Sequence, residues 1–216
     1  MNATGASGRS PAGFWKRYLA YSIDIALVSV LVQIVVLLVP AGSGQMDLEA
    51  LLQQQTAGIG QGVIPDPSLM MAQMASALLQ ALEFSVTATV LIAAVYFIGM
   101  ECSPRQATLG KRLVGIKVTD RRGARIGPAR AAARFAAGAL SWLTLNLGHA
   151  LAAWTPEKRA LHDYVADTYV DNADPANPGM PPWGWLVIGL QGLLLLLATV
   201  AIAVMLASAL ATFGGL

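Results

Sequence analysis

Residues 13–39 read GFWKRYLAYSIDIALVSVLVQIVVLLV, an apolar stretch long enough to cross a bilayer as one helix. We predict a membrane span over residues 18–39, with one acidic residue, Asp24, inside the apolar run. Arg17, Tyr21 and Asp24 are spaced i, i+4 and i+7, so they lie along one stripe of a helix. An acidic side chain near the centre of such a helix costs about 2.5 to 3.5 kcal/mol, and somewhat less off-centre. We therefore expect groups from the rest of the chain to meet this stripe.

The composition of the whole chain is that of a membrane protein. Of its 216 residues, 56% are hydrophobic and only 12% are charged, whereas soluble domains carry about 25% charged residues. Several apolar runs are long enough to span a bilayer, so we predict a mainly α, polytopic α-helical membrane protein with three to four membrane helices. The first run is longer than the apolar core of a signal peptide and contains an acid, so we expect it to be retained.

The remaining segments fall into a simple order. Residues 1–12 are rich in glycine, serine and alanine, and we expect a disordered tail there. Residues 41–82 form a polar insertion without lysine or arginine, and residues 84–100 form a second, charge-free span. A linker rich in proline and asparagine begins at residue 173 and leads to a final apolar helix over residues 186–213.

The most basic part of the chain lies between residues 105 and 134. Positive residues that flank membrane spans stay in the cytoplasm. The N-terminal tail is also basic, and the insertion at 41–82 is not. These three observations predict a cytoplasmic N-terminus and an extracytoplasmic insertion.

Part of this basic loop has the pattern of a strand and turn. Val114, Ile116 and Val118 alternate with other residues, and Gly123 suits the positive-φ position of a turn, which predicts a β-hairpin or a short strand and turn. Several basic side chains in and before this segment are candidates to contact anionic lipid headgroups. They are Lys111, Arg112, Arg121, Arg122 and Arg125. The alternative is that these charges only set the membrane topology. Without interleaved aromatic residues or a recognisable module, we do not expect nucleic-acid binding.

A third apolar segment covers residues 129–154, and its path has two alternatives. The segment either crosses the membrane once or turns back where Asn146, Gly148 and His149 interrupt the apolar pattern. Two observations favour a broken or re-entrant segment. The basic residues that follow it prefer the cytoplasm, and a strand near Tyr169 can pair with the strand near Ile116 only on the same side.

Three sequence blocks resemble those of the RDD family of bacterial membrane proteins. GFWKRYLAYSIDIALV resembles the opening signature, with Arg17 and Asp24 as its first two defining residues. QATLGKRLVGIKVTDRRG resembles the central Q-x-T-x-G-K segment, and EKRALHDYVADTYV resembles the closing L-H-D-x-x-x-x-T segment, with Asp163 as the second defining aspartate. The resemblance covers about residues 12–170 and implies a bacterial inner-membrane protein with a role in transport. The first loop and the C-terminal span lie outside it.

The first functional hypothesis is a transporter of ions or small solutes, with monovalent cations or protons as partners. Its site combines Arg17, Asp24 and Asp163, because acids inside a membrane are candidate proton or cation sites. Four residues are candidates to support this site: Tyr21, Asn146, His149 and His162. Two alternatives stay open. In the first, Arg17 and Asp24 are a fixed salt-bridged strut to the Leu-His-Asp segment and not a transport site. In the second, His149 is a core or interfacial histidine and does not support the site.

The second hypothesis is a non-transporting accessory or scaffold protein that binds a partner membrane protein, a second copy or anionic lipid. Enzyme catalysis is not expected, because no nucleophile–base motif or phosphate-binding loop is present. One cysteine and two histidines without metal-ligand spacing predict neither a metal site nor a disulfide, and no motif indicates a cofactor.

Overall fold

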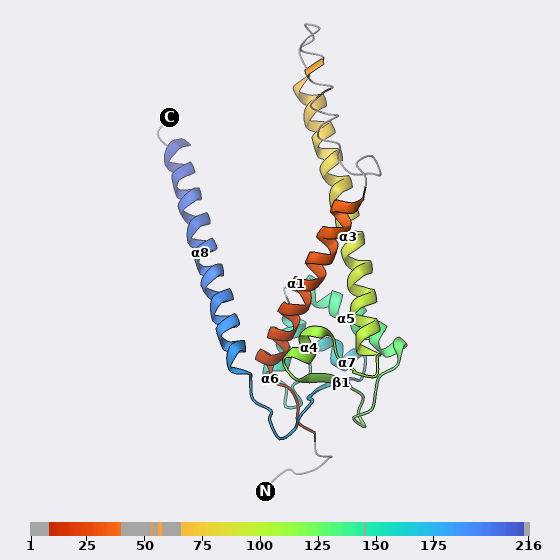
Figure 1. Ribbon diagram of the computed structural model, residues 1–216. Coiled ribbons are helices and arrows are strands. Elements are labelled where there is room, and N and C mark those ends of the chain that lie inside the picture. The colour runs from red at the N-terminus through yellow and green to blue at the C-terminus, as the bar shows by residue number, and fades with distance from the viewer. Residues whose placement is uncertain (1–8, 40–52, 54–55, 58–65, 145, 214–216) are drawn as a thin grey trace. The chain divides into compact units, whose positions relative to one another are not determined.

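The computed structural model describes residues 9–39, 53, 56–57, 66–144 and 146–213. The chain divides into two compact units, one formed by Met1–Ile23 with Met100–Leu216 and the other by Asp24–Gly99. In the part described, three helices are long and apolar enough to cross a membrane: α1 (Phe14–Leu38), α3 (Pro67–Glu101) and α8 (Pro182–Phe213) (Figure 1). The predicted mainly α membrane fold is confirmed.

Two of these helices begin earlier than their apolar runs suggest. Helix α1 begins at Phe14 rather than near residue 18, so its first turn carries aromatic and basic residues. Helix α3 begins directly after Asp66, whose Oδ1 accepts the backbone N–H of Ser68 at 2.8 Å. Residues 67–82, within the predicted polar insertion, extend this helix outward, as the helical spacing of their apolar side chains predicts. The other residues of this insertion lie largely outside the described residues.

The unit formed by Asp24–Gly99 contains most of the two apolar helices α1 and α3. Asp24, Val28 and Val32 are its buried positions on α1. Their spacing of four residues places them on one stripe of the helix. The buried positions on α3 are the small residues Ala77 and Ala93. Most other side chains of these helices are exposed, as expected for a surface that contacts lipid.

The other unit is built around a small sheet. Strand β1 (Ile116–Thr119) pairs antiparallel with β2 (Tyr169–Asn172), with Ile116 opposite Asn172 and Thr119 opposite Tyr169. The predicted strand and turn are present. The strand's partner is the segment near Tyr169, about fifty residues further on, which is one of the pairings that the sequence allows, and not the neighbouring strand of a local hairpin. A local hairpin would leave this apolar strand exposed, whereas the long-range pair buries Ile116 and Val118.

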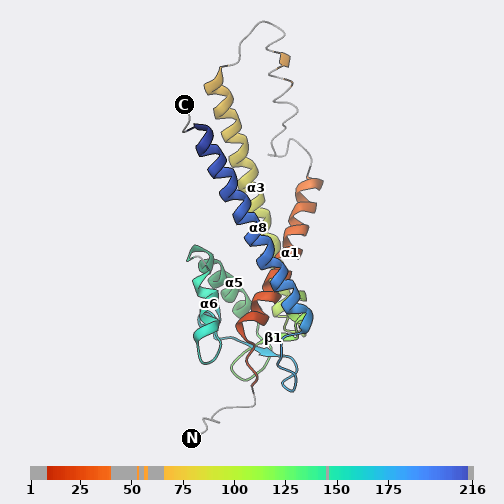
Figure 2. The same ribbon diagram turned by 90° about the vertical axis from the view of Figure 1, so that its left-hand side faces the viewer.

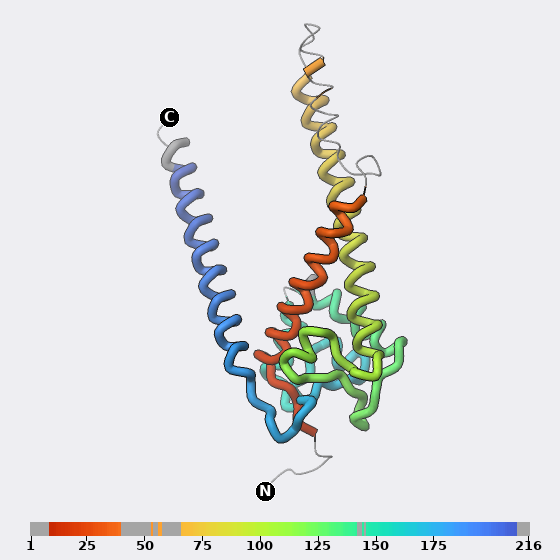
Figure 3. Tube along the Cα trace, in the orientation of Figure 1, coloured from red at the N-terminus to blue at the C-terminus, as the bar shows by residue number. Residues whose placement is uncertain are grey.

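The end of the expected disordered tail is ordered on this sheet. Pro11 forms a bridge with Asp171, Ala12 N–H donates to Val170 O at 2.9 Å, and Asn172 N–H donates to Ser10 O at 2.7 Å. Residues 9–12 thus add a short third segment to the edge of β2, and residues 1–8 lie outside the described part. Figure 3 traces this first described segment into α1.

Four shorter helices surround the sheet: α4 (Leu109–Leu113), α5 (Pro128–Leu143), α6 (Leu147–Trp154) and α7 (Leu161–Val165). The chain reverses between α5 and α6, which lie side by side (Figure 2). Asn146 takes the left-handed conformation, φ 63°, at this reversal, which asparagine tolerates better than most residues. A Cβ on Gly148 would lie 2.3 Å from Ser141 Oγ, so the close approach of α6 to α5 requires glycine. This reversal is the path expected if residues 129–154 turn back instead of crossing the membrane once.

Helix α8 begins at Pro182 and meets the start of α1. A Cβ on Gly184 would lie 2.7 Å from Leu19 Cδ2, and the Trp15 and Trp185 rings are 6.1 Å apart. Beyond this contact, no residue in the most apolar stretch of α8 is buried.

Candidate functional site

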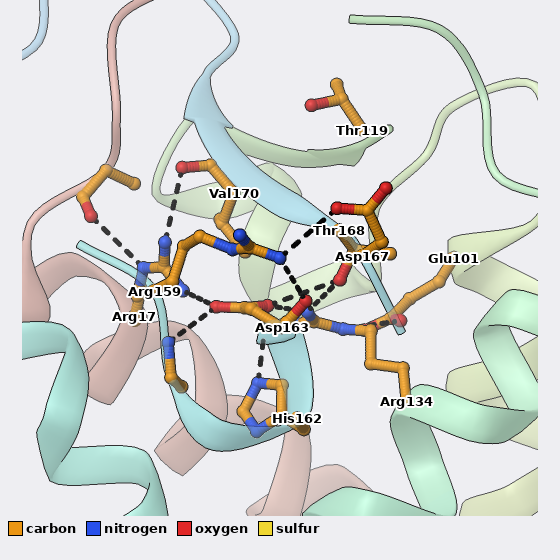
Figure 4. Close-up of polar contacts among 12 residues, drawn as sticks. Arg17, Glu101, Thr119, Arg134, Arg159, His162, Asp163, Asp167, Thr168 and Val170 are labelled. Carbon is orange, nitrogen blue, oxygen red and sulfur yellow. Dashed lines mark hydrogen bonds and ion pairs between the residues drawn. The ribbon is translucent and has the colours of Figure 1, made fainter. Parts of the chain in front are cut away.

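Asp163 lies at the centre of a buried network of charges (Figure 4). It stands in the first turn of α7 and is fully buried. Its Oδ2 accepts the backbone N–H of Ala160 at 2.9 Å and Arg17 Nη1 at 2.6 Å. Its Oδ1 accepts Arg134 Nη1 from α5. Two arginines and a backbone N–H therefore hold this carboxylate in its ionised form.

The two arginines also contact other acceptors. Arg17 Nε donates to Ala12 O at 3.1 Å, and its Nη2 lies 3.5 Å from Val170 O. Arg17 therefore ties the start of α1 to the edge of β2 and to α7. Arg134 donates from Nη1 to Thr168 Oγ1 at 3.0 Å and pairs through Nε with Glu101 Oε2 at 3.0 Å.

Glu101 is a second buried carboxylate, at the C-terminal end of α3. Its Oε1 accepts Lys111 Nζ from α4 at 2.6 Å. The charges form a continuous row of three cations and two anions. In order, they are Lys111, Glu101, Arg134, Asp163 and Arg17. Removal of one member leaves an uncompensated buried charge, which costs about 3 to 5 kcal/mol.

Arg159 supports the network from the loop before α7. Its Nη2 donates to the backbone oxygen of Asp163 at 2.8 Å. Its guanidinium also lies 4.3 Å from the Tyr164 ring and 4.4 Å from the Tyr169 ring. These cation–π contacts orient the guanidinium, which also pairs with the carboxylates of Glu157 at 3.4 Å and Asp167 at 3.5 Å.

A row of aromatic rings lies beside the charges. The Tyr21 and His149 rings are 5.4 Å apart, and the His149 and His162 rings are 4.9 Å apart. Burial and nearby Arg134 lower the pKa of His149 to about 4 and hold the pKa of His162 well below its usual range. Both imidazoles are therefore neutral at pH 7, so the 3.6 Å approach of His162 Nε2 to Asp163 Oδ1 is not an ion pair. Nδ1 of each histidine has no hydrogen-bond partner among the described residues.

Asp24 belongs to the other unit and has its own local site. Its side chain is fully buried, and its Oδ1 accepts the Tyr96 hydroxyl of α3 at 2.6 Å. Both residues lie within helices that are apolar enough to span a membrane. The phenol can donate to the ionised carboxylate or accept from the protonated one.

The predicted site residues are thus found in distinct settings. Arg17 and Asp163 form a direct ion pair, and three of the four supporting residues make contacts in the same unit. They are Tyr21, His149 and His162. The fourth, Asn146, is the N-cap position of α6 and makes no side-chain capping bond. In the part described, no three histidine, cysteine, aspartate or glutamate side chains are grouped as metal ligands.

The predicted lipid contacts need one correction. Lys111 is paired with Glu101 and its side chain is only 12% exposed, so its ammonium is engaged inside the protein. The four arginines of that prediction are exposed: Arg112, Arg121, Arg122 and Arg125. The basic loop therefore combines one structural lysine with a solvent-facing set of arginines.

Sequence reasoning missed several members of the network. Glu101 directly follows the charge-free second span and precedes the basic loop. An acid at that boundary could have been predicted to pair with one of the loop's basic residues. Thr168 closes the L-H-D-x-x-x-x-T block without an assigned role, and it contacts Arg134. Nothing in the sequence singles out Tyr96 as the partner of Asp24.

The central Q-x-T-x-G-K block also acquires a physical explanation. Gln106 takes a left-handed conformation, with φ 54°. Its backbone oxygen accepts the N–H of Val118 at 2.7 Å, and its side-chain Nε2 donates to Val118 O at 3.1 Å. Thr108 caps α4 by accepting the N–H of Lys111. The block therefore fixes α4 against β1 and directs Lys111 to Glu101.

Comparison with known proteins decides the family. The model of the RDD family matches residues 11–167. This chain belongs to the RDD family. The match includes Arg17, Asp24 and Asp163, so the predicted resemblance is confirmed. Three apolar helices and this membership make it a multi-pass membrane protein in contact with the lipid bilayer.

One curated relative of this RDD protein is the uncharacterized protein YxaI of Bacillus subtilis (strain 168). The two are 28% identical over 165 residues, which cover 74% of this chain and 96% of YxaI. No solved structure matches this chain. The family match ends at residue 167, so α8 lies outside it.

Proposed function

We propose that this RDD-family protein transports monovalent cations or protons across the membrane, with Asp24 as the carboxylate that binds them. The observation that carries the proposal is the fully buried Asp24 with the Tyr96 hydroxyl at 2.6 Å, within two membrane helices. An acid inside an apolar helix is costly unless it binds a proton, a cation or a fixed counter-charge.

In this mechanism, Asp24 alternates between a protonated and a cation-bound state. Tyr96 accepts a hydrogen bond from the protonated carboxyl and donates one to the ionised carboxylate. The hydroxyl therefore stabilises both states by a rotation of its O–H bond. The Arg17–Asp163 network has the role of a fixed strut, because its carboxylates are already compensated by arginine and lysine.

Flux measurements in proteoliposomes test the proposal. With a trapped pH-sensitive dye, wild-type protein should exchange protons when an external monovalent cation is added. Asp24→Asn should abolish this exchange, and Tyr96→Phe should reduce it. Glu83→Gln is the matched control, because Glu83 is an exposed acid on the same helix as Tyr96. Flux unchanged in Asp24→Asn, or no cation-dependent flux from folded wild-type protein, would contradict the proposal.

We also propose that the basic face and the N-terminus are cytoplasmic. The exposed arginines after α3 support this orientation through the preference of flanking positive charges for the cytoplasm. Cysteines introduced at positions 122 and 158, after replacement of Cys102, should both react only with a membrane-permeant reagent in intact cells. Labelling of either position by an impermeant reagent would overturn the orientation.

A second candidate function is favoured by α8. Its most apolar stretch has no buried residue, so it offers a full surface to lipid or to another membrane protein. If the protein is a scaffold, deletion of α8 should abolish co-purification of a membrane partner. In that case the wild-type protein should also show no cation flux. The flux measurement therefore separates the two functions.

A further inference from the structure

A cavity lies where the start of α1, the end of β2 and the linker to α8 meet. Its volume is about 200 Å³, and it is separate from the Asp163 network. The residues that matter for its chemistry are Gly13, Trp15, Lys16, Lys158 and Asn172. All belong to the same compact unit.

Lys16 gives the cavity an uncompensated positive charge. It is only 6% exposed, and its Nζ donates to Asn172 Oδ1 at 2.8 Å. This acceptor is a neutral amide, and no carboxylate of a described residue pairs with Lys16. A covered ammonium with three donors and one neutral acceptor is costly, and an anionic ligand would compensate it.

Two further features add positive potential to the same cavity. Lys158 lines it from an exposed loop and makes no ion pair with a described residue. Gly13 to Lys16, which also line it, lead into and form the first turn of α1, a helix of 25 residues. The N–H groups of a first turn have no acceptor within the helix, and the helix dipole favours an anion there.

The aromatic residues place the cavity at the membrane surface. Trp15 lines it and is 48% exposed, and its ring lies 6.1 Å from Trp185 at the start of α8. Tryptophan at the ends of membrane helices sits at the level of lipid headgroups. The cavity therefore lies at the depth where phosphates of the bilayer are found.

We propose that this cavity binds the phosphate of an anionic phospholipid, with Lys16, Lys158 and the first turn of α1 as its donors. The site differs from the exposed arginines of the basic loop, which face solvent rather than a cavity. It does not depend on the transport proposal. Phosphate is the shared chemistry, and a soluble phosphate ion is the other source that the test must separate.

The experiment measures lipid binding to the full, delipidated protein in detergent by native mass spectrometry. Wild-type protein should bind phosphatidylglycerol more tightly than phosphatidylcholine, whose choline group repels the lysines. Lys158→Gln should weaken phosphatidylglycerol binding about fivefold, because a lysine near an anionic surface contributes about 1 kcal/mol. Lys16→Gln combined with Lys158→Gln should weaken it about 30-fold on the same basis.

Three controls keep this test decisive. Lys158 is exposed, so its single variant should fold and report even if the Lys16 variant does not. Arg105→Gln with Arg130→Gln removes two exposed charges that neither line the cavity nor belong to the predicted lipid contacts, and it should leave the affinity within about twofold of wild type. Inorganic phosphate at millimolar concentration should not displace the lipid.

Four outcomes would overturn the proposal. Equal affinity for the two lipids would remove the preference for an anionic headgroup. Unchanged binding in Lys158→Gln, or an equal loss in the arginine control, would remove the assignment to the cavity. Displacement by inorganic phosphate would identify a soluble anion site instead.

Discussion

Arg17 of α1 donates to the carboxylate of Asp163 across 2.6 Å, although 146 residues separate them in the chain. Arg134 of α5 contacts the other oxygen of the same carboxylate. One buried acid thus joins the first membrane helix to α5, α7 and the edge of the sheet.

Asp163→Asn should destabilise the protein by about 3 to 5 kcal/mol, because Arg17 and Arg134 would lose their shared counter-charge while still buried. Chemical unfolding in detergent, followed by tryptophan fluorescence, measures the change. Asp174→Asn is the control: Asp174 is exposed, and its Oδ1 accepts the backbone N–H of Ala176, which an asparagine side chain can also accept. Similar losses in the two variants would show that the network is not specific.

Lys111→Gln should destabilise the protein clearly more than Arg122→Gln, although both remove one basic charge from the same loop. Lys111 pairs with buried Glu101 at 2.6 Å, whereas Arg122 is exposed and should change stability by less than about 0.5 kcal/mol. Glu101→Gln combined with Lys111→Gln should cost less than the sum of the single changes, because the pair is removed together. Additive costs would contradict a direct coupling of the two side chains.

Gly148→Ala should cost about 1 to 3 kcal/mol, because the added methyl group would overlap Ser141 at the reversal between α5 and α6. Ser141→Ala alone should be neutral or slightly stabilising, since Ser141 Oγ is buried and has no hydrogen-bond partner among the described residues. Thermal unfolding of both variants and of their combination checks this. The combination should be more stable than Gly148→Ala, and the opposite order would exclude this close approach.

Stability should fall as the pH is lowered from about 7 toward 4. Burial lowers the folded-state pKa of His149 to about 4 and depresses that of His162, whereas an unfolded histidine titrates near 6.5. Between these values the unfolded state binds more protons than the folded state, so protonation favours unfolding. Above about pH 6.5 the full stabilisation is present.

Melting temperatures measured from pH 7.5 to 4.5 test this dependence. His149→Gln and His162→Asn should each flatten the curve, since the replaced side chain no longer titrates. A slope unchanged in the double variant would assign the pH dependence to other groups.

The sequence alone determined the membrane character of the protein, its apolar helices and its family, because these depend on local composition and on motifs that are contiguous in the chain. It also indicated Arg17 and Asp163 as site residues through those motifs. The tertiary structure decided their partners. Glu101 pairs with Arg134 and Tyr96 with Asp24, because ion pairs and hydrogen bonds depend on which distant segments the fold brings together. For β1, the sequence allowed a local hairpin or a pair with the strand near Tyr169, and the tertiary structure selected the second.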